Sequence, residues 1–378
     1  MKKFIIFIPI LMFFIVSCAP AAPAEVAPPA ADNDTEVTQP ATEPPAEEGG
    51  TRVALIPSLG GIDDGSFNQG SFEGMVQFAQ GNNIGFTYIQ PIESSDAGYI
   101  NAMELAINGG AQLIVAPGFS FATAMYQAQD LFPDTMFILV DTAPENPETW
   151  EPRIESNVVA LSYAEEQAGF LAGYAVVIEG HRSLGFIGGL AMPPVSGFGH
   201  GFIQGAEYAA ISLGLSPGDV TVIYHYAMTF DPEPSVFALA SAWYNDGVEV
   251  IFAAAGGAGF AVMQAAETHG GLVVGVDIDQ AGDSPSVITS ALKGLHYSVY
   301  TAVGMYFEGN FPGGQSLRFA ADNYGVGLSM DTSRFANFTQ ANYEAIFNRL
   351  ATGEVVPTFD VTLDANQLDV TYVTVILV

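Results

Sequence analysis

The chain has 378 residues, with 41 Asp or Glu against 9 Lys or Arg, and a formal net charge of −32 at pH 7. Such an acidic balance argues against nucleic acid and against anionic lipid surfaces as partners. The single cysteine, Cys18, excludes an intramolecular disulfide, so folding depends on an ordinary core. About 330 residues follow the N-terminal region, which is enough for two lobes of ordinary domain size.

The N-terminus has the pattern of a secretory signal peptide. Lys2 and Lys3 precede an apolar run from Phe4 to Val16, which is too short for a comfortable transmembrane span. The Ile-Val-Ser-Cys ending resembles a lipobox, in which a lipid such as palmitate is attached to the cysteine. We predict a signal peptide at 1–17 and a lipid anchor on Cys18, with the mature lipoprotein on the extracytoplasmic side of a cell membrane, at the cell surface or in the periplasm. A plain signal peptide that is cleaved further along is the alternative.

Residues 18–50 are expected to form a tether. After Cys18 this segment is dominated by Ala, Pro, Glu, Asp and Thr and has no aromatic or basic residue. Such a composition cannot bury enough apolar surface to offset the entropy of ordering, so we predict a disordered Pro-rich spacer.

From Arg52 onward, short β-branched or apolar runs alternate with helical patterns. The predicted strands are 53–56, 86–89, 113–116, 136–141, 158–161, 183–187, 220–224, 248–254, 272–276 and 287–290. The predicted helices are 71–80, 99–107, 122–131, 165–178, 202–213, 235–245 and 259–269. This alternation predicts an α/β protein with parallel sheets that are covered by helices on both faces.

The order of the strands indicates two sheets. Roughly the first four strands form one sheet and the later group forms a second, with a crossover near 157–163, while the tail 357–378 is expected to add further strands. Ligands of open α/β sheets bind outside the carboxyl ends of the strands. Two such sheets that face each other would enclose a cleft.

The segment 60–70 follows the first predicted strand and combines glycines with polar residues around Phe67. A polar helix-capping loop is one interpretation, but it does not explain the aromatic residue. At the carboxyl end of a strand, Phe67 is well placed to stack on a planar ligand. Asn68 can both donate to and accept from the edge of a heterocyclic base.

Carboxylates stand at the ends of two other predicted strands. Asp141 ends one, and Asp277 and Asp279 follow another. A carboxylate can accept two hydrogen bonds from the vicinal hydroxyls of a sugar, although capping or solvated carboxylates and a divalent metal site are alternatives. No His or Cys with ligand spacing accompanies these residues, so we expect no metal.

Two further features point to a small polar ligand. The glycine-rich segment 255–259 matches neither dinucleotide nor P-loop patterns, so its backbone N–H groups are expected to approach a neutral polar ligand. Lys293 is the only lysine besides Lys2 and Lys3. It is therefore expected to contact a ribose or base oxygen, with a chance surface position as the alternative.

The sequence does not favour an enzyme. Its five histidines are scattered without H-E-x-x-H spacing, there is no G-x-S-x-G elbow, and the single cysteine, Cys18, is expected to carry the lipid. We expect no catalytic residues and no cofactor.

Five blocks of sequence occur in the order seen in one known family. They are 63–69 (DDGSFNQ), 185–189 (GFIGG), 255–259 (AGGAG), 275–280 (GVDIDQ) and 289–293 (TSALK). Over about 52–306, and more weakly to 356, the chain resembles the basic membrane protein (BMP) family, which includes purine nucleoside receptor lipoproteins. It departs from that family in its acidity and in its tail.

The resemblance implies a type I periplasmic-binding-protein fold with two Rossmann-like lobes that close on a ligand. The N-terminal lobe would comprise 51–160 and about 285–315, and the C-terminal lobe about 161–284 and about 316–356. Phe67 would stack on one face of a purine and Phe230 on the other, with Phe198 and Phe237 as nearby candidates for the second position. Asp64, Asn68 and Asp141 would contact the base. Asp277, Lys293 and the Gly257 backbone would contact the ribose.

The resulting hypothesis is the binding subunit of an ABC importer, with permease and ATPase subunits as partners and a purine nucleoside (inosine, guanosine or adenosine) as ligand. A carboxylate-rich cleft should reject phosphorylated ligands. The alternatives are a sensor or adhesion lipoprotein with the same fold and another small ligand, and a hydrolase that acts on nucleosides.

Overall fold

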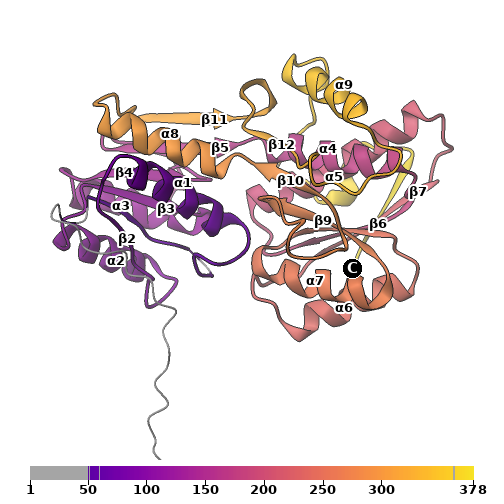
Figure 1. Ribbon diagram of the computed structural model, residues 1–378, viewed down its shortest axis with the longest axis horizontal. Helices are drawn as coiled ribbons and strands as arrows, with labels where there is room; N and C mark the ends of the chain where they lie inside the picture. Colours follow the sequence, from indigo (N-terminus) through magenta and orange to yellow (C-terminus); the bar gives the residue numbers. More distant parts are fainter. Residues whose placement is uncertain (1–49, 51, 59, 361) are drawn as a thin grey trace, which may run out of the picture. The chain divides into compact units, whose positions relative to one another are not determined.

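The computed structural model describes residues 50, 52–58, 60–360 and 362–378 (Figure 1). The predicted signal peptide, the lipidation site and the tether except Gly50 lie outside the described residues. Within the part of the chain that is described, no helix has both the length and the apolar character needed to cross a membrane.

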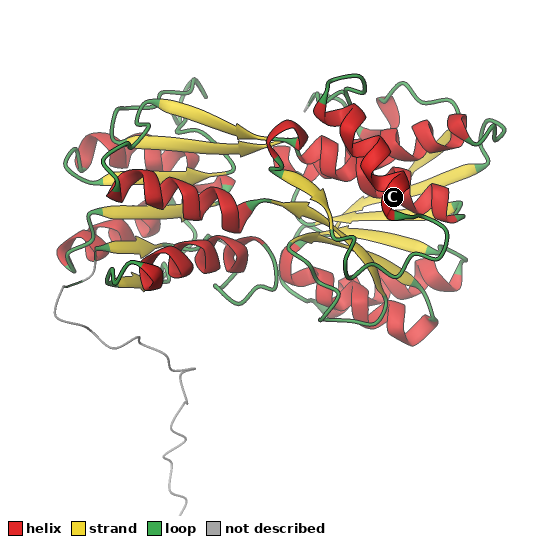
Figure 2. Ribbon diagram, turned by 45° about the horizontal axis from the view of Figure 1, so that its top comes forward, coloured by secondary structure: helices red, strands yellow, loops and turns green. Residues whose placement is uncertain are grey.

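The first lobe is built on a six-stranded, fully parallel sheet with the strand order β11-β5-β4-β3-β1-β2. Its strands are β1 (Val53–Leu55), β2 (Phe86–Tyr88), β3 (Leu113–Pro117), β4 (Met136–Val140), β5 (Val158–Tyr163) and β11 (Gln315–Phe319). Its helices are α1 (Phe67–Gly81), α2 (Asp96–Asn108), α3 (Ala122–Leu131) and α8 (Leu295–Phe307), with a 3₁₀ turn η1 (Phe119–Phe121). Helices cover both faces of the sheet (Figure 2).

The sequence of β1 explains this two-sided burial. All three of its residues are fully buried and apolar, and successive side chains of a strand point to opposite faces. Val53 and Leu55 pack with Met75 of α1, whereas Ala54 packs with Met103 of α2 on the other face. A continuous apolar run, rather than an alternating one, is what a parallel sheet requires.

The second lobe is built on a seven-stranded sheet with the order β12-β10-β9-β8-β6-β7-β13, in which only β12 is antiparallel to its neighbour. Its strands are β6 (Ser183–Gly188), β7 (Val220–Tyr226), β8 (Val250–Ala254), β9 (Leu272–Asp277), β10 (Val287–Lys293), β12 (Val326–Leu328) and β13 (Val373–Leu377). Its helices are α4 (Glu165–Glu179), α5 (Pro193–Ser212), α6 (Pro234–Asn245), α7 (Gly259–His269) and α9 (Gln340–Ala351). Three 3₁₀ turns complete the described elements: η2 (Gly256–Ala258), η3 (Ala321–Asn323) and η4 (Ala365–Gln367).

The chain passes between the two sheets after β5, after β10 and after β11. The second and third crossings lie later than the boundaries expected at about 285 and 316. β10 continues to Lys293 in the second sheet because it pairs with β9, and β11 belongs to the first sheet because it pairs with β5. In Figure 1, α8 and β11, drawn in orange, accordingly lie with the indigo to magenta elements of the first lobe. The tail contributes one strand, β13, to the free edge of the second sheet.

Helices α4 and α5 pack against each other through glycines. Each helix contributes two glycines to the contact, Gly169 and Gly173 from α4 and Gly201 and Gly205 from α5. The helices are so close that a Cβ at any of the four would overlap a backbone carbonyl oxygen of the opposite helix. Spacing two glycines four residues apart on each helix puts both pairs on the contacting faces. The helix that carries Glu165 is thereby fixed on the second lobe.

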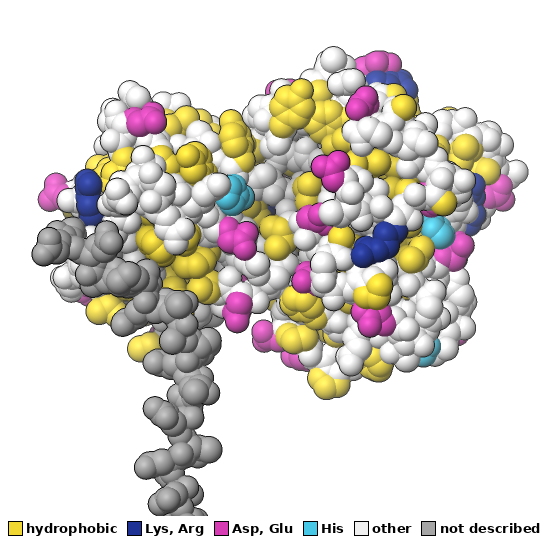
Figure 3. All heavy atoms as spheres, in the orientation of Figure 1, with side chains coloured by type: hydrophobic (Ala, Val, Ile, Leu, Met, Phe, Trp, Pro, Cys, Tyr) yellow, Lys and Arg dark blue, Asp and Glu magenta, His cyan; other side chains and the backbone are white. Residues whose placement is uncertain are grey.

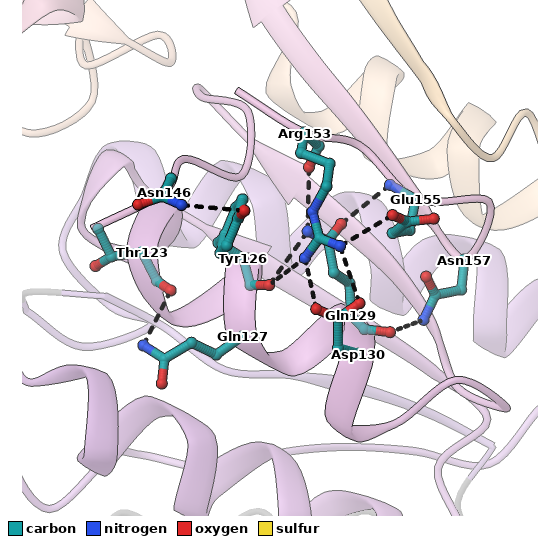
Figure 4. Close-up of polar contacts among 9 residues, drawn as sticks. All are labelled: Thr123, Tyr126, Gln127, Gln129, Asp130, Asn146, Arg153, Glu155 and Asn157. Atoms are coloured by element: carbon teal, nitrogen blue, oxygen red, sulfur yellow. Dashed lines mark hydrogen bonds and ion pairs between the residues drawn. The ribbon is translucent and has the colours of Figure 1, made fainter. Parts of the chain in front are cut away.

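A polar network fixes the long connection between β4 and β5 (Figure 4). The buried Asn157 amide donates to three carbonyl oxygens at the C-terminal end of α3 and just beyond it, at 3.1–3.2 Å. Arg153 lies over the Tyr126 ring at 4.3 Å and forms an ion pair of 2.6 Å with Asp130. Gln129 accepts from the backbone N–H of Glu155 at 3.0 Å. These bonds satisfy orphan carbonyls of the helix terminus and anchor the connection that begins at Asp141.

Candidate ligand-binding site

A cavity of about 260 Å³ lies at the carboxyl ends of the strands of both sheets. This volume is near the lower end of the range of small-molecule sites. Residues from both lobes line the cavity, and all eight residues that were predicted from the sequence are among them: Asp64, Phe67, Asn68, Asp141, Phe230, Gly257, Asp277 and Lys293. Phe198, one alternative to Phe230, also lines it, whereas Phe237 and Asp279 are not among its lining residues.

Asp64 organises the loop before α1. Its carboxylate accepts hydrogen bonds from the backbone N–H groups of Ser66, Asn68 and Gln69 at 2.9–3.0 Å, and from the Asn68 amide at 3.0 Å. Burial raises the pKa of Asp64, and the hydrogen bonds lower it in part. These bonds satisfy orphan N–H groups at the start of α1. Asp64 therefore holds the first turn of the helix that presents Phe67, in addition to its place in the cavity wall.

Asn68 links this loop to the end of the first strand. Its Oδ1 accepts from the Ser58 backbone N–H at 3.3 Å and from the Ser58 hydroxyl at 3.4 Å. The side chain is almost fully buried, at 1 % exposure, although the residue lines the cavity. The geometry therefore fixes the orientation of the amide before any ligand contacts it.

Asp141 and Asp277 occupy corresponding positions in the two lobes, directly after β4 and at the last residue of β9. Both have left-handed backbone conformations, with φ of 79° and 67°. This region is uncommon for residues other than glycine, and such outliers cluster at functional sites. Each turn sets an acidic residue in the cavity wall at the point where the strand ends.

Direct hydrogen bonds join the lobes beside the cavity. The buried Ser66 hydroxyl donates to Asp277 Oδ2 at 2.6 Å, and Gln280 Nε2 donates to the Gly65 carbonyl at 2.8 Å. Gln280 Oε1 in turn accepts from the Val276 backbone N–H at 2.9 Å. Gln280 thus ties the end of β9 to the loop before α1.

Lys293, the last residue of β10, is 4 % exposed and lies in a cluster of acids and aromatic rings. Its Nζ is 2.7 Å and 2.8 Å from the two carboxylate oxygens of Asp141 and 3.0 Å from Glu165 Oε1. Burial lowers the pKa of Lys293, but the negative charges of its acidic neighbours outweigh burial and raise it overall. The ammonium is therefore charged and links the two lobes through Asp141.

Three aromatic rings complete the surroundings of Lys293. Its Nζ lies 5.1 Å from the ring centre of Phe67, 5.0 Å from that of Tyr163 and 5.5 Å from that of Phe198. A cation over a ring face is attracted by the ring quadrupole. The Tyr163 hydroxyl is also hydrogen-bonded to Ser298 of α8.

The glycine-rich segments make room for Phe230. A Cβ at Gly189 would overlap the Phe230 ring, and one at Gly257 would lie 3.1 Å from the Phe230 carbonyl oxygen. The same carbonyl accepts from the Ala258 N–H at 2.8 Å. Close packing of these backbones therefore brings the aromatic residue to the cavity wall.

Sequence reasoning missed several residues at or behind the site, including two aromatic residues and a buried acid. Phe119 and Phe260 line the cavity, each in the turn or helix that follows a strand, and this shared position was a signal that could have identified them. Glu165, which contacts Lys293, was assigned only to a helix. Nothing in its sequence context distinguishes it from Glu166, which instead pairs with Arg318.

The cavity is electrostatically negative. Its described lining residues include five aspartates, Asp63, Asp64, Asp141, Asp231 and Asp277, and a single cation, Lys293. Burial raises the pKa of Asp277 to about 6, against the lowering effects of Lys293 and the Ser66 hydrogen bond.

Among the residues with described positions, no cluster of three or more His, Cys, Asp or Glu could hold a metal ion. On the face drawn in Figure 3, acidic side chains are scattered over both lobes without an extended basic patch.

Comparison with known proteins gives a consistent result. Residues 51–354 match the family described as "ABC transporter substrate-binding protein PnrA-like". The chain is 28 % identical over 305 residues to the "ABC transporter nucleoside-binding protein BmpA" of Lactococcus lactis subsp. cremoris, covering 75 % of this chain and 82 % of that protein. It is 29 % identical over 304 residues to "Basic membrane protein D" of Borreliella burgdorferi, covering 79 % and 82 %.

Solved structures share the fold. An ABC transporter solute-binding protein from Aeropyrum pernix K1 matches with a TM-score of 0.69 at 22 % identity, covering 82 % of this chain and 94 % of that one. A second solute-binding protein, from Conexibacter woesei, matches with a TM-score of 0.64 at 21 % identity, covering 82 % and 99 %. These matches support the two-lobed α/β architecture expected from the sequence.

Proposed function

Because the chain belongs to the PnrA-like family of ABC transporter substrate-binding proteins, we propose that its ligand is a purine nucleoside, bound in the cavity between the lobes. The family consists of substrate-binding proteins rather than enzymes. The Lactococcus relative is named a nucleoside-binding protein, which supports the assignment of the ligand. Inosine, guanosine and adenosine are the candidates.

The observation that carries the proposal is the composition of the cavity wall. Aromatic residues from both lobes, Phe67 and Phe230, stand with buried carboxylates at two strand ends. A nucleoside needs both kinds of group, since its base stacks on rings and its ribose hydroxyls donate to carboxylates. In the proposed complex Phe67 and Phe230 hold the base, with Asn68 and Asp141 at its edge. Asp277 and the Gly257 backbone contact the ribose.

The charge of the wall favours nucleosides over nucleotides. Three carboxylate oxygens already surround the Lys293 ammonium at 2.7–3.0 Å. A phosphate would have to compete with them for the one cation while it approached the remaining acids. Removing a phosphate from water without a compensating cation is costly, so nucleoside monophosphates should bind more weakly.

The proposal includes transport by permease and ATPase subunits of an ABC importer. It also includes an extracytoplasmic location, with a lipid on Cys18 and the segment 18–50 as a tether, all of which except Gly50 lie outside the described residues. Mass spectrometry of the N-terminal peptide tests the anchor. An acylated N-terminal Cys18 is expected, and an unmodified peptide that begins beyond Cys18 would contradict it.

Isothermal titration calorimetry tests the ligand. Inosine, guanosine or adenosine should bind at submicromolar to micromolar concentrations, whereas free ribose and the matching 5′-monophosphates should bind much more weakly. Tighter binding of a monophosphate, or binding of a monosaccharide and no nucleoside, would overturn the proposal. Incubation with inosine should release no free base, because the family consists of substrate-binding proteins rather than hydrolases.

A further inference from the structure

Glu165 is a buried acid that stands behind the cavity. It is the first residue of α4, it is 5 % exposed, and its Oε1 is 3.0 Å from Lys293 Nζ. It is not among the described residues that line the cavity. Its direct contact with the cavity wall is therefore through Lys293.

The charges of this cluster can be counted from its geometry. Lys293 lies within hydrogen-bonding distance of Asp141 and Glu165. Its other titratable neighbours are Asp277 and Tyr163. With Lys293, Asp141 and Glu165 all ionised, these three residues carry one net negative charge. When Glu165 holds a proton, the same three residues are neutral and Lys293 is balanced by Asp141 alone.

We propose that Glu165 is a positioning residue that sets the charge of the Lys293 cluster and so determines how strongly the cavity rejects anionic ligands. The inference rests on the proposed nucleoside function. Ionised Glu165 holds the ammonium between two carboxylates and cancels its attraction for a phosphate. Protonated Glu165 leaves Lys293 with one charged partner and makes an anion easier to accept.

The environment moves the titration of Glu165 well above the pH range of an ordinary glutamate. Burial raises the pKa of Glu165, Lys293 lowers it in part, and the nearby negative charge of Asp141 raises it again. A carboxyl that is desolvated beside a second carboxylate takes up a proton at a higher pH than a free glutamate. The cluster therefore becomes more negative as pH rises, and discrimination against phosphorylated ligands should increase with it.

The test compares Glu165→Gln with a matched control, Glu166→Gln. Gln resembles protonated Glu in shape and charge, and Glu166 is the next residue, also buried, but paired with Arg318 instead of Lys293. Calorimetry measures the dissociation constants of inosine 5′-monophosphate and of inosine for each protein, and the ratio of the two is compared. The measurements run from about pH 5 to about pH 9, a range that brackets the titration of a glutamate whose pKa is raised.

At the acid end, wild type and Glu165→Gln should give the same ratio. At the alkaline end, Glu165→Gln should accept the monophosphate about tenfold better relative to inosine than wild type does, an effect of the size expected for one charge in a partly screened site. Glu166→Gln should follow wild type throughout. Equal ratios for all three proteins at every pH would overturn the proposal.

A second readout needs no ligand. With ¹³C-labelled lysine, the Lys293 Cε resonance is assigned by its loss in Lys293→Arg, since the only other lysines are Lys2 and Lys3. In wild type this resonance should show one transition near pH 6 from Asp277 and a second at higher pH as Glu165 titrates. The second transition should be absent from Glu165→Gln but present in Glu166→Gln. If the transition persists in Glu165→Gln, the assignment is wrong. If instead no nucleoside binds while the transition behaves as expected, only the proposed function fails.

Discussion

At the residue scale, two aspartates with left-handed backbone conformations supply the carboxylates at the strand ends in the cavity wall. Asp141 and Asp277 each hold a left-handed backbone at the end of a strand, and each is fixed by a bond across the lobes, to Lys293 and to Ser66. Strained positions cost free energy and persist when the surrounding structure determines them. The two acids are therefore oriented before a ligand arrives, which lowers the cost of binding.

Replacing Phe67 with alanine should weaken nucleoside binding. Loss of one stacking face is worth ~1 kcal/mol or more, which is roughly fivefold or more in Kd. Phe237→Ala is the control, because Phe237 is not among the residues that line the cavity. Calorimetry with inosine should separate the two variants, and equal affinities would place the base elsewhere.

The raised pKa of Asp277 predicts a pH dependence of stability. The ordinary value of 3.8 rises to about 6 in the folded protein, chiefly through burial, so the folded state binds more protons than the unfolded state between these values. The contribution of Asp277 to stability is therefore full below the unfolded pKa and is lost as pH rises through the folded pKa. Asp277→Asn lacks this loss, so its free energy of unfolding relative to wild type should increase from about pH 4 to about pH 7, by at most about 3 kcal/mol.

Urea denaturation of both proteins across that range measures the difference. A difference that is independent of pH would mean that Asp277 titrates normally in the folded protein. Both proteins should be compared without added nucleoside, since ligand binding itself stabilises the folded state.

At the scale of elements, the contact of α4 with α5 tolerates no side chain larger than hydrogen at its four glycines. Gly201→Ala would push a Cβ into the Glu166 carbonyl oxygen, and overpacking of this kind costs about 2 kcal/mol or more. Gly81→Ala is the control, because a Cβ at the end of α1 meets open space, and it should stabilise by about 0.5 kcal/mol. Chemical denaturation should give opposite signs for the two variants.

The same contact explains where sequence reasoning was incomplete. The predicted helix 202–213 corresponds to the later part of α5, which begins at Pro193. Its first turns contain three glycines, at 197, 199 and 201, which have low intrinsic helix propensity. Packing against α4 overrides that preference, and no local pattern in α5 reveals the partner helix.

All ten predicted strands are present, as β1 to β10, and the clearest of them are continuous apolar runs such as β4 and β8. β11, with the sequence QSLRF, was not predicted, because it is a largely exposed edge strand held by its pairing with β5. The predicted residues share one cavity because the carboxyl ends of parallel strands meet at the same edge. Glu165 could not be found this way, since its role depends on which strand end α4 follows and on the distant Lys293.

At the scale of the whole binding domain, the lobes are held by specific polar contacts beside the cavity. Lys293–Asp141, Ser66–Asp277 and Gln280–Gly65 all join residues that are far apart in the sequence. Ser66 and Gln280 are buried and are not among the lining residues, so their bonds stabilise this arrangement of the lobes without touching a ligand. Ligand affinity should therefore depend on residues outside the cavity.

Ser66→Ala tests this dependence. It removes one buried hydrogen bond to Asp277, worth ~1 kcal/mol, and should weaken inosine binding by roughly fivefold. Small-angle X-ray scattering should show a larger radius of gyration in the absence of ligand, as closure becomes less favourable. Ser71→Ala is the control, because the side-chain hydrogen bond that this buried serine makes among the described residues stays within α1, to the Phe67 carbonyl. If both variants behave alike, the Ser66 bond does not contribute to closure.

The most direct test of the nucleoside assignment is to identify the ligand that the native protein carries through purification. The protein is isolated without denaturant and its small-molecule content is analysed by mass spectrometry, with Phe67→Ala prepared in parallel. A purine nucleoside without phosphate, close to stoichiometric in wild type and depleted in Phe67→Ala, is the predicted result. A sugar, a peptide or a nucleotide at the same occupancy would contradict the assignment.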